Sequence, residues 1–461
     1  MFSQSAKLLP VTRCVQYTAA EKCRRGCTSS LYITGDRGTE SCIILSPYVN
    51  LNRRFEDTEA LVKNVQSRGL NVDIPQLKSS WEQYQNLSKF KLQLDSEKSG
   101  SFAKLNAAKA LHKPKVLNEL KADYNAIKER LSSVKKELWD VERKAILGGL
   151  SLPNDIHPDT PSNNESEKIV HEFGQKPAVS DSCPSHLEVA NKLGLIEYYD
   201  SSYYFLIDDA ARFEMGISYF FQDKLKEIGY ITMSNSDFGK SVVVEGVGLD
   251  PRDASSVFTL ERDSDSKDPT ARLHLVGGAS LVSFSAFHTK TATNIKHLPL
   301  RYVAIGRHYN PDNNKGLHGL FSTWQSSAVE TFVLAADKNM AMEEFKLCLK
   351  EIIDLYETLG YHFRVEYLPP ASLKPWESLR ASIQMFSKNM VKYIEVGSLS
   401  LCDDFISQRL LMCCEPASGK SLQFAHVISG TVVSVPRILG CVLEYNADSF
   451  ELPPQVSAAI L

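Results

Sequence analysis

The sequence predicts an α+β protein in which an N-terminal antiparallel coiled-coil helical arm precedes an antiparallel sheet flanked by helices. Three observations predict this arrangement. A heptad pattern spans residues 117–145, and a polar stretch that contains Pro153, Pro158, Pro161 and Pro177 follows it. The remainder contains many strand-like segments with few helices between them. Strands that follow one another without intervening helices favour antiparallel pairing.

Length and composition set the limits for this fold. The 461 residues provide room for two or three domains of about 100–200 residues each. A formal net charge of −3, an apolar content of 43% and a charged content of 23% exclude a mostly disordered chain and a collagen-like one. The apolar runs fall short of the ~18 residues that a membrane span needs, so no membrane insertion is expected.

Generic site motifs are missing from the sequence. The ten cysteines form no CxxC pair, so no metal site is expected and a reducing compartment is favoured. Gly419-Lys420-Ser421 lacks the glycine that a phosphate-binding loop has five positions earlier, where Cys414 stands. Gly246 and Gly248 lack the third glycine of a dinucleotide fingerprint.

Residues 1–30 are interpreted as a mitochondrial transit peptide. They contain five basic residues, seven Ser or Thr residues and a single acid, Glu21. An Arg- and Ser-rich, acid-poor composition with scattered apolar residues is typical of such peptides. The sequence therefore predicts a protein of the mitochondrial matrix.

Residues 50–149 are predicted to form the helical arm. Residues 55–68 and 76–96 are expected to be helical, with a break over 99–115 that contains a glycine and a proline. Nine apolar positions then alternate in steps of three and four: Leu117, Leu120, Tyr124, Ile127, Leu131, Val134, Leu138, Val141 and Ala145. This repeat is typical of a coiled-coil seam, and two consecutive helices of this kind predict an antiparallel hairpin.

The predicted tip of the arm is basic. Between residues 98 and 118 there are five lysines and no acid: Lys98, Lys104, Lys109, Lys113 and Lys115. Several ammonium groups on one tip can bind a phosphate backbone and release its counterions. The lysines are therefore candidates for RNA binding; the alternative is a solvated lysine face, and no base-reading motif accompanies them.

Residues 150–185 are interpreted as a linker and residues 186–461 as the sheet domain. Helices are expected at residues 186–195, 208–228, 343–358 and 435–443. Strands are expected at residues 203–207, 273–287, 300–309, 319–324, 330–336, 362–367, 393–400, 410–414 and 421–428.

The order of arm, linker and sheet resembles the seryl-tRNA synthetases, which are class II aminoacyl-tRNA synthetases. Local stretches resemble this family in the same order: residues 151–159, 186–196, 203–230, 298–303, 394–409 and 436–437. The third stretch occupies motif 1, the family's dimer element, the fourth opens motif 2, and the last resembles motif 3. The resemblance implies a class II synthetase-type sheet and a tRNA-binding type of arm.

The positions that this family uses for catalysis depart from its pattern. Adenylation needs cations around the α-phosphate, but Asn310 and Ser322 stand where the family has two motif 2 arginines. Ser326 replaces an adenine-stacking aromatic residue. Ala286 replaces the carboxylate of a serine-recognising Thr-x-Glu element, and Ser429 replaces an asparagine near the serine pocket. The resemblance therefore implies a pseudo-enzyme without catalytic residues.

Four family positions are retained. Glu395 and Ser398 match magnesium ligands, Glu330 matches a serine contact, and Arg437 matches a γ-phosphate contact. They either leave a residual ATP and magnesium site or persist for structural reasons, with Arg437 and Glu395 as a buried ion pair. We expect no cofactor.

These observations predict a catalytically inactive paralogue, similar to the insect mitochondrial seryl-tRNA synthetase-like proteins. Its expected partners are the active mitochondrial seryl-tRNA synthetase, in a heterodimer, or a second copy of itself, together with mitochondrial tRNA or another nucleic acid. Two alternatives stay open. One is a divergent but active serine–tRNA ligase, and the other is a mitochondrial adaptor for DNA maintenance or proteolysis.

Overall fold

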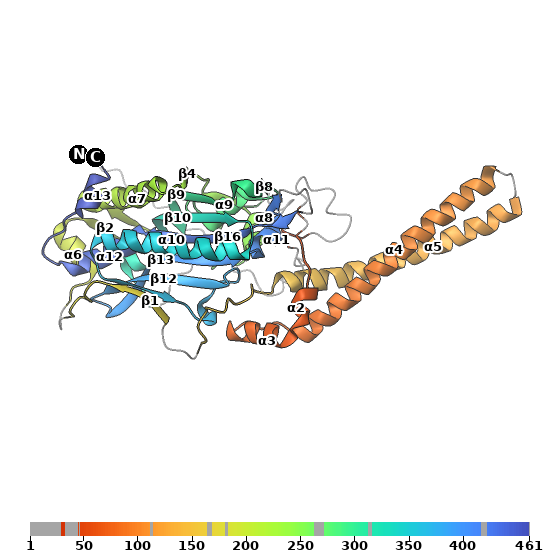
Figure 1. The fold of residues 1–461 in the computed structure, drawn as a ribbon, viewed down its shortest axis with the longest axis horizontal. Helices are drawn as coiled ribbons and strands as arrows, with labels where there is room; N and C mark the ends of the chain where they lie inside the picture. The colour runs from red at the N-terminus through yellow and green to blue at the C-terminus, as the bar shows by residue number, and fades with distance from the viewer. Residues whose placement is uncertain are drawn as a thin grey trace, which may run out of the picture.

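The computed structural model describes residues 29–32, 45, 47–110, 114–163, 168–179, 183–261, 272–311, 316–415 and 422–460. Two long helices project from a body built on a large sheet (Figure 1). The transit peptide expected at residues 1–30 lies outside the described residues, except for Ser29 and Ser30. Nowhere in the described ranges is a helix both long enough and apolar enough to cross a membrane.

The arm consists of α4 (Ile74–Ala110) and α5 (Pro114–Leu150), each of 37 residues and therefore about 55 Å long. Two short helices, α2 (Asn52–Glu56) and α3 (Thr58–Ser67), precede it. The break expected over residues 99–115 is wrong, because α4 continues through Gly100 to Ala110 and Pro114 is already the first residue of α5. Proline is compatible with a first helical turn, where its missing N–H has no intrahelical partner.

The apolar positions of α5 face α4. Leu131, Leu138 and Ala145 are buried. The remaining six positions of the predicted seam are partly buried, while most residues between them are exposed. Rings of the two helices meet at Phe102 and Tyr124, whose centroids are 6.0 Å apart. The antiparallel pair of helices that the periodicity predicted is therefore present.

The N-terminal segment Ser29–Tyr32 packs onto the body and the base of the arm. The backbone amides of Ser30 and Leu31 donate to Glu245 Oε2 at 2.6 and 3.0 Å, and the Ser29 hydroxyl donates to Glu245 Oε1. The Tyr32 hydroxyl donates to Glu142 of α5. The first residues that the structure describes thus belong to the fold.

The expected linker contains a strand. β1 (Lys168–Phe173) pairs antiparallel with β11 (Phe363–Tyr367) and forms one edge of the main sheet. The sequence signal is weak because β1 is largely exposed, so its residues show no buried apolar face.

The main sheet has eight strands in the order β1-β11-β12-β13-β16-β10-β9-β4. All neighbours are antiparallel except β4 and β9. The remaining six strands of this sheet are β4 (Ile231–Met233), β9 (Leu300–Tyr309), β10 (Gln325–Ala335), β12 (Leu379–Ser387), β13 (Lys392–Asp403) and β16 (His426–Ser434). Smaller sheets contain β2 (Ile196–Tyr198), β3 (Tyr204–Leu206), β5 (Phe238–Lys240), β6 (Phe258–Leu260), β7 (Leu273–Leu275), β8 (Ala292–Asn294), β14 (Cys413–Glu415) and β15 (Gln423–Phe424).

Helices enclose this sheet in two hydrophobic clusters. The larger cluster joins the sheet to α6 (His186–Leu193), α7 (Asp209–Glu227), α10 (Lys338–Leu359), α12 (Val435–Tyr445) and α13 (Pro454–Ala458). The second joins it to α8 (Ser241–Val247), α9 (Leu281–His288) and α11 (Phe405–Leu410). Three 3₁₀ turns, η4 (Ile295–His297), η5 (Gly319–Phe321) and η6 (Pro370–Ser372), complete the described elements. The α+β fold is therefore as the sequence predicts.

Two predicted strands are wrong. The strand expected at 273–287 ends at Leu275, and α9 follows, with the Ser280 side chain accepting from the Ser283 amide at its start. The strand expected at 319–324 is the 3₁₀ turn η5. Burial explains the first error, because a short helix buried on most sides lacks the polar face that separates helix from strand in a sequence.

Candidate functional site

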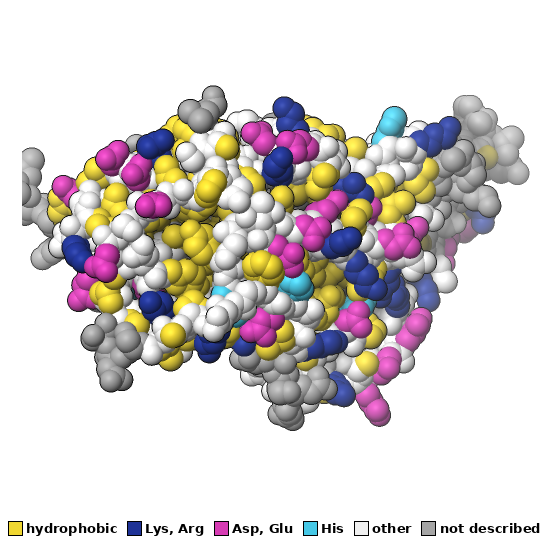
Figure 2. Space-filling view, turned by 60° about the vertical axis from the view of Figure 1, so that its left-hand side comes forward, with side chains coloured by type: hydrophobic (Ala, Val, Ile, Leu, Met, Phe, Trp, Pro, Cys, Tyr) yellow, Lys and Arg dark blue, Asp and Glu magenta, His cyan; other side chains and the backbone are white. Residues whose placement is uncertain are grey.

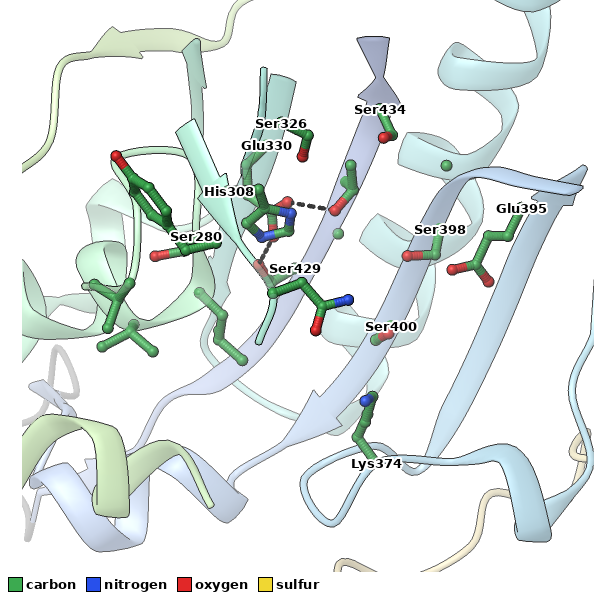
Figure 3. Close-up of a pocket in the computed structure, with 18 of the residues that line it drawn as sticks. Ser280, His308, Ser326, Glu330, Lys374, Glu395, Ser398, Ser400, Ser429 and Ser434 are labelled. Atoms are coloured by element: carbon green, nitrogen blue, oxygen red, sulfur yellow. Dashed lines mark hydrogen bonds between the residues drawn. The ribbon is translucent and has the colours of Figure 1, made fainter. Parts of the chain in front are cut away.

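A cavity of about 500 Å³ opens between the main sheet, the start of α9 and the start of α12 (Figure 3). Its wall combines residues of β9, β10, β12, β13 and β16. Eight of the nine positions carried over from the resemblance line it: Asn310, Ser322, Ser326, Glu330, Glu395, Ser398, Ser429 and Arg437. Residues that are far apart in the sequence thus meet in one site.

Ala286 is the exception. It is exposed on α9 and does not line the cavity. At this part of the wall the lining residues are Ser280, Leu281 and Val282, at the start of the same helix. The resemblance placed the serine-recognising element at residues 284–286, but these residues belong to α9, whose first residues face the cavity instead.

Strand alternation supplies the polar floor of the cavity. On β13, Ser398 and Ser400 line the cavity, while Leu399 and Leu401 are buried in the core. Successive side chains of a strand point to opposite faces, so one strand provides both a core layer and a row of hydroxyl groups. In Figure 3 the side chains of Ser398 and Ser400 follow one another along their strand.

Glu330 is an uncharged carboxyl at neutral pH. Its side chain is 4% exposed and accepts hydrogen bonds from Thr431 Oγ1 at 2.9 Å and Ser429 Oγ at 3.2 Å (Figure 3). Burial raises the pKa of Glu330 to about 8, although the two hydroxyl donors oppose this shift. The retained acid therefore contributes little negative charge to the site at pH 7 and below.

His308 and Arg437 share one region of the cavity. Burial and the neighbouring Arg437 guanidinium lower the pKa of His308 to about 4, so its imidazole is neutral at pH 7. Arg437 Nη1 donates to the backbone oxygen of Glu395 at 3.1 Å. No described carboxylate lies within ion-pair distance of this guanidinium, so the expected Arg437–Glu395 side-chain ion pair is not formed.

Arg380 is the site residue that the sequence analysis missed. Its Nη2 lies 2.7 Å from Glu395 Oε1, and its Nη1 lies 3.0 Å from Glu377 Oε1. Burial alone opposes ionisation of both groups, but the opposite charges outweigh it and raise the pKa of Arg380 and lower that of Glu395. A lone arginine within the strand sequence LRASIQMFS is the signal that could have indicated it, because a buried cation requires a partner.

The retained residues do not fit the divalent cation that the resemblance implies. Both carboxylate oxygens of Glu395 are engaged, Oε1 by Arg380 and Oε2 by the Ser382 hydroxyl at 2.7 Å. Within the described ranges there is no group of three or more His, Cys, Asp or Glu side chains that could hold a metal ion. Magnesium prefers several oxygen ligands in octahedral geometry, and the donors from Arg380 and Ser382 leave no free carboxylate oxygen on Glu395 for it.

The candidate RNA-binding lysines of α4 lie on the outer half of the arm, which projects away from the body that contains the cavity (Figure 1). Lys104 and Lys109 are exposed on α4, and Lys98 is partly exposed on the same helix. Lys115 lies in the first turn of α5, but its side chain is outside the described part of the structure, as is the whole of Lys113.

A second exposed feature is apolar. Large hydrophobic side chains are exposed on β3, α7 and β4 and in the connection between β2 and β3: Tyr199, Tyr203, Phe205, Met215, Tyr219 and Ile231. We call these residues the apolar surface. Figure 2, in which the end of the body away from the arm comes forward, shows hydrophobic side chains in groups among charged ones on this end.

The part of the chain that forms most of the cavity wall matches a known family of domains. A model of the tRNA synthetase class II core domain (G, H, P, S and T) matches residues 265–446, which include most of the cavity wall. The chain therefore contains a class II tRNA synthetase core domain.

Similarity extends over nearly the whole chain. The serine–tRNA synthetase-like protein Slimp of Drosophila melanogaster is 29% identical over 434 residues, covering 93% of this chain and 91% of Slimp. The mitochondrial serine–tRNA ligase of Mus musculus is 29% identical over 426 residues, covering 87% and 80%. Among solved structures, the seryl-tRNA synthetase of Pyrococcus horikoshii complexed with ATP aligns with a TM-score of 0.76 at 18% identity, over 89% of this chain and 98% of that one.

Proposed function

We propose that the protein is a catalytically inactive mitochondrial paralogue of seryl-tRNA synthetase that acts as a partner subunit or RNA-binding factor in support of mitochondrial translation. The observation that carries this proposal is the wall of the cavity. Asn310 and Ser322 line it as neutral residues where the resemblance places two phosphate-binding arginines. Removal of a single donor that stabilises a transition-state charge costs a factor of about 10²–10³ in rate.

Further losses act in the same direction. Ser326 offers no aromatic face for a base. The cavity wall at the start of α9 carries the hydroxyl of Ser280, so no acid stands there for a substrate ammonium. Arg437, Lys374 and Arg380 place positive charge at the cavity, but Arg380 is paired with Glu377 and Glu395, and the remaining two cations do not replace the missing set.

The test of inactivity is serine-dependent ATP–pyrophosphate exchange by the purified chain, alone and mixed with the active mitochondrial seryl-tRNA synthetase. We expect no exchange by the chain alone and a changed rate in the mixture. Exchange by the chain alone would instead establish the alternative, a divergent serine–tRNA ligase. The observations behind this alternative are the presence of the cavity and the retained Arg437.

The proposed partnership rests on the apolar surface, which overlaps the stretch that resembles motif 1, the dimer element. Four of its six residues fall within residues 203–230: Tyr203, Phe205, Met215 and Tyr219. An exposed group of apolar side chains is typical of a subunit interface, either with a second copy of the chain or with a related subunit. Co-purification from mitochondria should recover the active synthetase as a heterodimer. Recovery of a homodimer alone would favour self-association, and recovery of DNA-maintenance or proteolytic factors without the synthetase would favour the adaptor alternative.

The proposed division of the chain follows the same logic. In this division, residues 1–30 direct import into the mitochondrial matrix and residues 50–149 bind RNA. Residues 150–185 link this arm to the degenerate catalytic domain, which is formed by residues 186–461. The mitochondrial names of the mouse, bovine and yeast ligases support the location. Fractionation of cells that produce a tagged chain, with mass determination of its N-terminus, tests it.

A further inference from the structure

Arg380 connects two acidic residues at the wall of the cavity. It reaches Glu377 at 3.0 Å and Glu395 at 2.7 Å, and both contacts are charge-assisted hydrogen bonds. The three side chains are 14%, 3% and 28% exposed, respectively. Such pairs are screened little by solvent, so the arrangement is persistent and breaking it would leave a poorly solvated charge.

The two carboxylates are saturated. Glu395 accepts from Arg380 and from Ser382, one donor on each oxygen. Glu377 Oε1 accepts from Arg380 and from the Ser400 hydroxyl at 2.7 Å, and Glu377 Oε2 accepts from the Lys374 amide at 2.7 Å. All four carboxylate oxygens therefore already hold a donor.

A divalent cation could bind here only by displacing Arg380. The cavity offers oxygen atoms of the kind that magnesium and manganese prefer, since the hydroxyls of Ser398 and Ser400 line it next to the two acids. The guanidinium, however, occupies the position between the carboxylates and repels a second cation. The space between Glu377 and Glu395 therefore holds either the guanidinium or a metal ion, but not both.

We propose that Arg380 is an internal counter-cation that replaces a divalent metal ion in this cavity. Its loss, with Glu377 and Glu395 kept, converts the cavity into a divalent cation site. The inference deepens the proposed function and rests on it, but it concerns metal binding without nucleotide, so the two can fail separately.

The experiment measures binding of Mn²⁺ to the purified full chain, in the absence of nucleotide, by electron paramagnetic resonance. Four proteins are compared: the natural chain, Arg380→Gln, Arg380→Lys and the double variant Arg380→Gln with Glu395→Gln. We expect Arg380→Gln to bind one Mn²⁺ ion. The natural chain and the lysine variant, which keep the positive charge, should leave the ion free, and the double variant should lose the site.

Thermal unfolding provides a second readout, which is independent of the resonance signal of the ion. Arg380→Gln should unfold at a lower temperature than the natural chain and regain stability when Mn²⁺ is added, because a ligand of the native state stabilises it. Added Mn²⁺ should leave the natural chain unaffected.

Two outcomes overturn the proposal. One is binding of Mn²⁺ by the natural chain that Glu395→Gln abolishes, a comparison that remains possible if Arg380→Gln does not fold. The other is a folded Arg380→Gln chain that neither binds nor is stabilised by the ion. Serine-dependent exchange by the natural chain would instead overturn the proposed function, whatever the Mn²⁺ result.

Discussion

At the residue scale, the charges in the cavity depend on neighbours rather than on residue type. Glu330 and Glu395 are both glutamates of central strands that line one cavity. Burial with only neutral hydroxyl donors raises the pKa of Glu330 to about 8. The Arg380 guanidinium, against the effect of burial, holds the pKa of Glu395 below its usual value. Two identical side chains therefore carry different charges at pH 7.

Glu330 makes stability depend on pH. Its pKa is about 4.5 when exposed and about 8 in the fold, so the folded state binds the proton more tightly. The stabilisation is complete below pH 4.5 and is lost as the pH rises through 8, at up to about 1.4 kcal/mol per pH unit. Glu330→Gln should flatten this part of the stability curve in denaturant titrations between pH 5 and 9. The exposed Glu343→Gln should leave the slope unchanged, and an unchanged slope in Glu330→Gln would refute the assignment.

At the element scale, α4 demonstrates how packing overrides a local breaker. Gly100 is exposed in the middle of the helix, and a Cβ atom there would meet no atom within 4 Å. The apolar contacts with α5 compensate for the low helix propensity of glycine, because helices in proteins are stabilised mainly by the face that they bury.

Gly100→Ala should therefore stabilise the arm by about 0.5–1 kcal/mol, since alanine loses less conformational entropy in a helix. Thermal unfolding followed by circular dichroism measures the change. Gly440→Ala is the matched control in α12, where the new Cβ would lie 2.6 Å from Phe321 Cε1 and should destabilise the body. A destabilising effect of Gly100→Ala would contradict a continuous α4.

The N-terminal segment Ser29–Tyr32 depends on one carboxylate. Glu245→Gln replaces a charged acceptor of three hydrogen bonds by a neutral one, and a bond to a charged group contributes about 1.5–3 kcal/mol. Hydrogen exchange of the Leu31 amide should become faster in this variant. Exposed Glu82→Gln serves as the control. Unchanged exchange at Leu31 would show that Glu245 does not hold the segment.

At the scale of the whole molecule, a single arginine connects the helices at the base of the arm to the wall of the cavity. Arg68, at the end of α3, donates to the backbone oxygens of Lys374 at 2.9 Å and Glu377 at 2.7 Å, in the segment that lines the cavity. The same guanidinium also donates to Asn154 O at 3.2 Å. The base of the arm therefore holds one wall of the cavity in place.

Arg68→Met should lower the free energy of unfolding by on the order of 3 kcal/mol, because it leaves buried carbonyl groups without donors. Hydrogen exchange should accelerate at residues 374–377. The exposed Arg53→Met is the control, and equal exchange in both variants would exclude coupling between arm and cavity.

The arm lysines make a separate prediction at this scale. A variant with Lys104→Gln and Lys109→Gln should bind mitochondrial tRNA more weakly. The slope of log affinity against log salt concentration should become shallower by about one for each phosphate that no longer pairs with an ammonium group. The control replaces Lys296 and Lys392, exposed lysines of the body, by glutamine. Equal affinity and slope for both double variants would assign RNA binding to another surface.

Local and periodic information determined much of the fold in advance. The heptads of α5 and the long α7 follow directly from periodicity, because each has one buried and one exposed face. Elements without that contrast were missed or misassigned. α9 is buried on most sides and resembles a strand in sequence, whereas β1 is largely exposed and resembles a linker.

For the site, the sequence by itself indicated which family positions are neutral. Eight of the nine positions reach the cavity because they lie on central strands, in the connection between β9 and β10, or at the start of α12. Only the tertiary structure decided that Arg380 lies between Glu377 and Glu395, and that Ser280 rather than Ala286 faces the cavity. The physical reason is that residue type and spacing are written along the chain, whereas the charge of a buried group depends on neighbours that strand pairing brings together from distant positions.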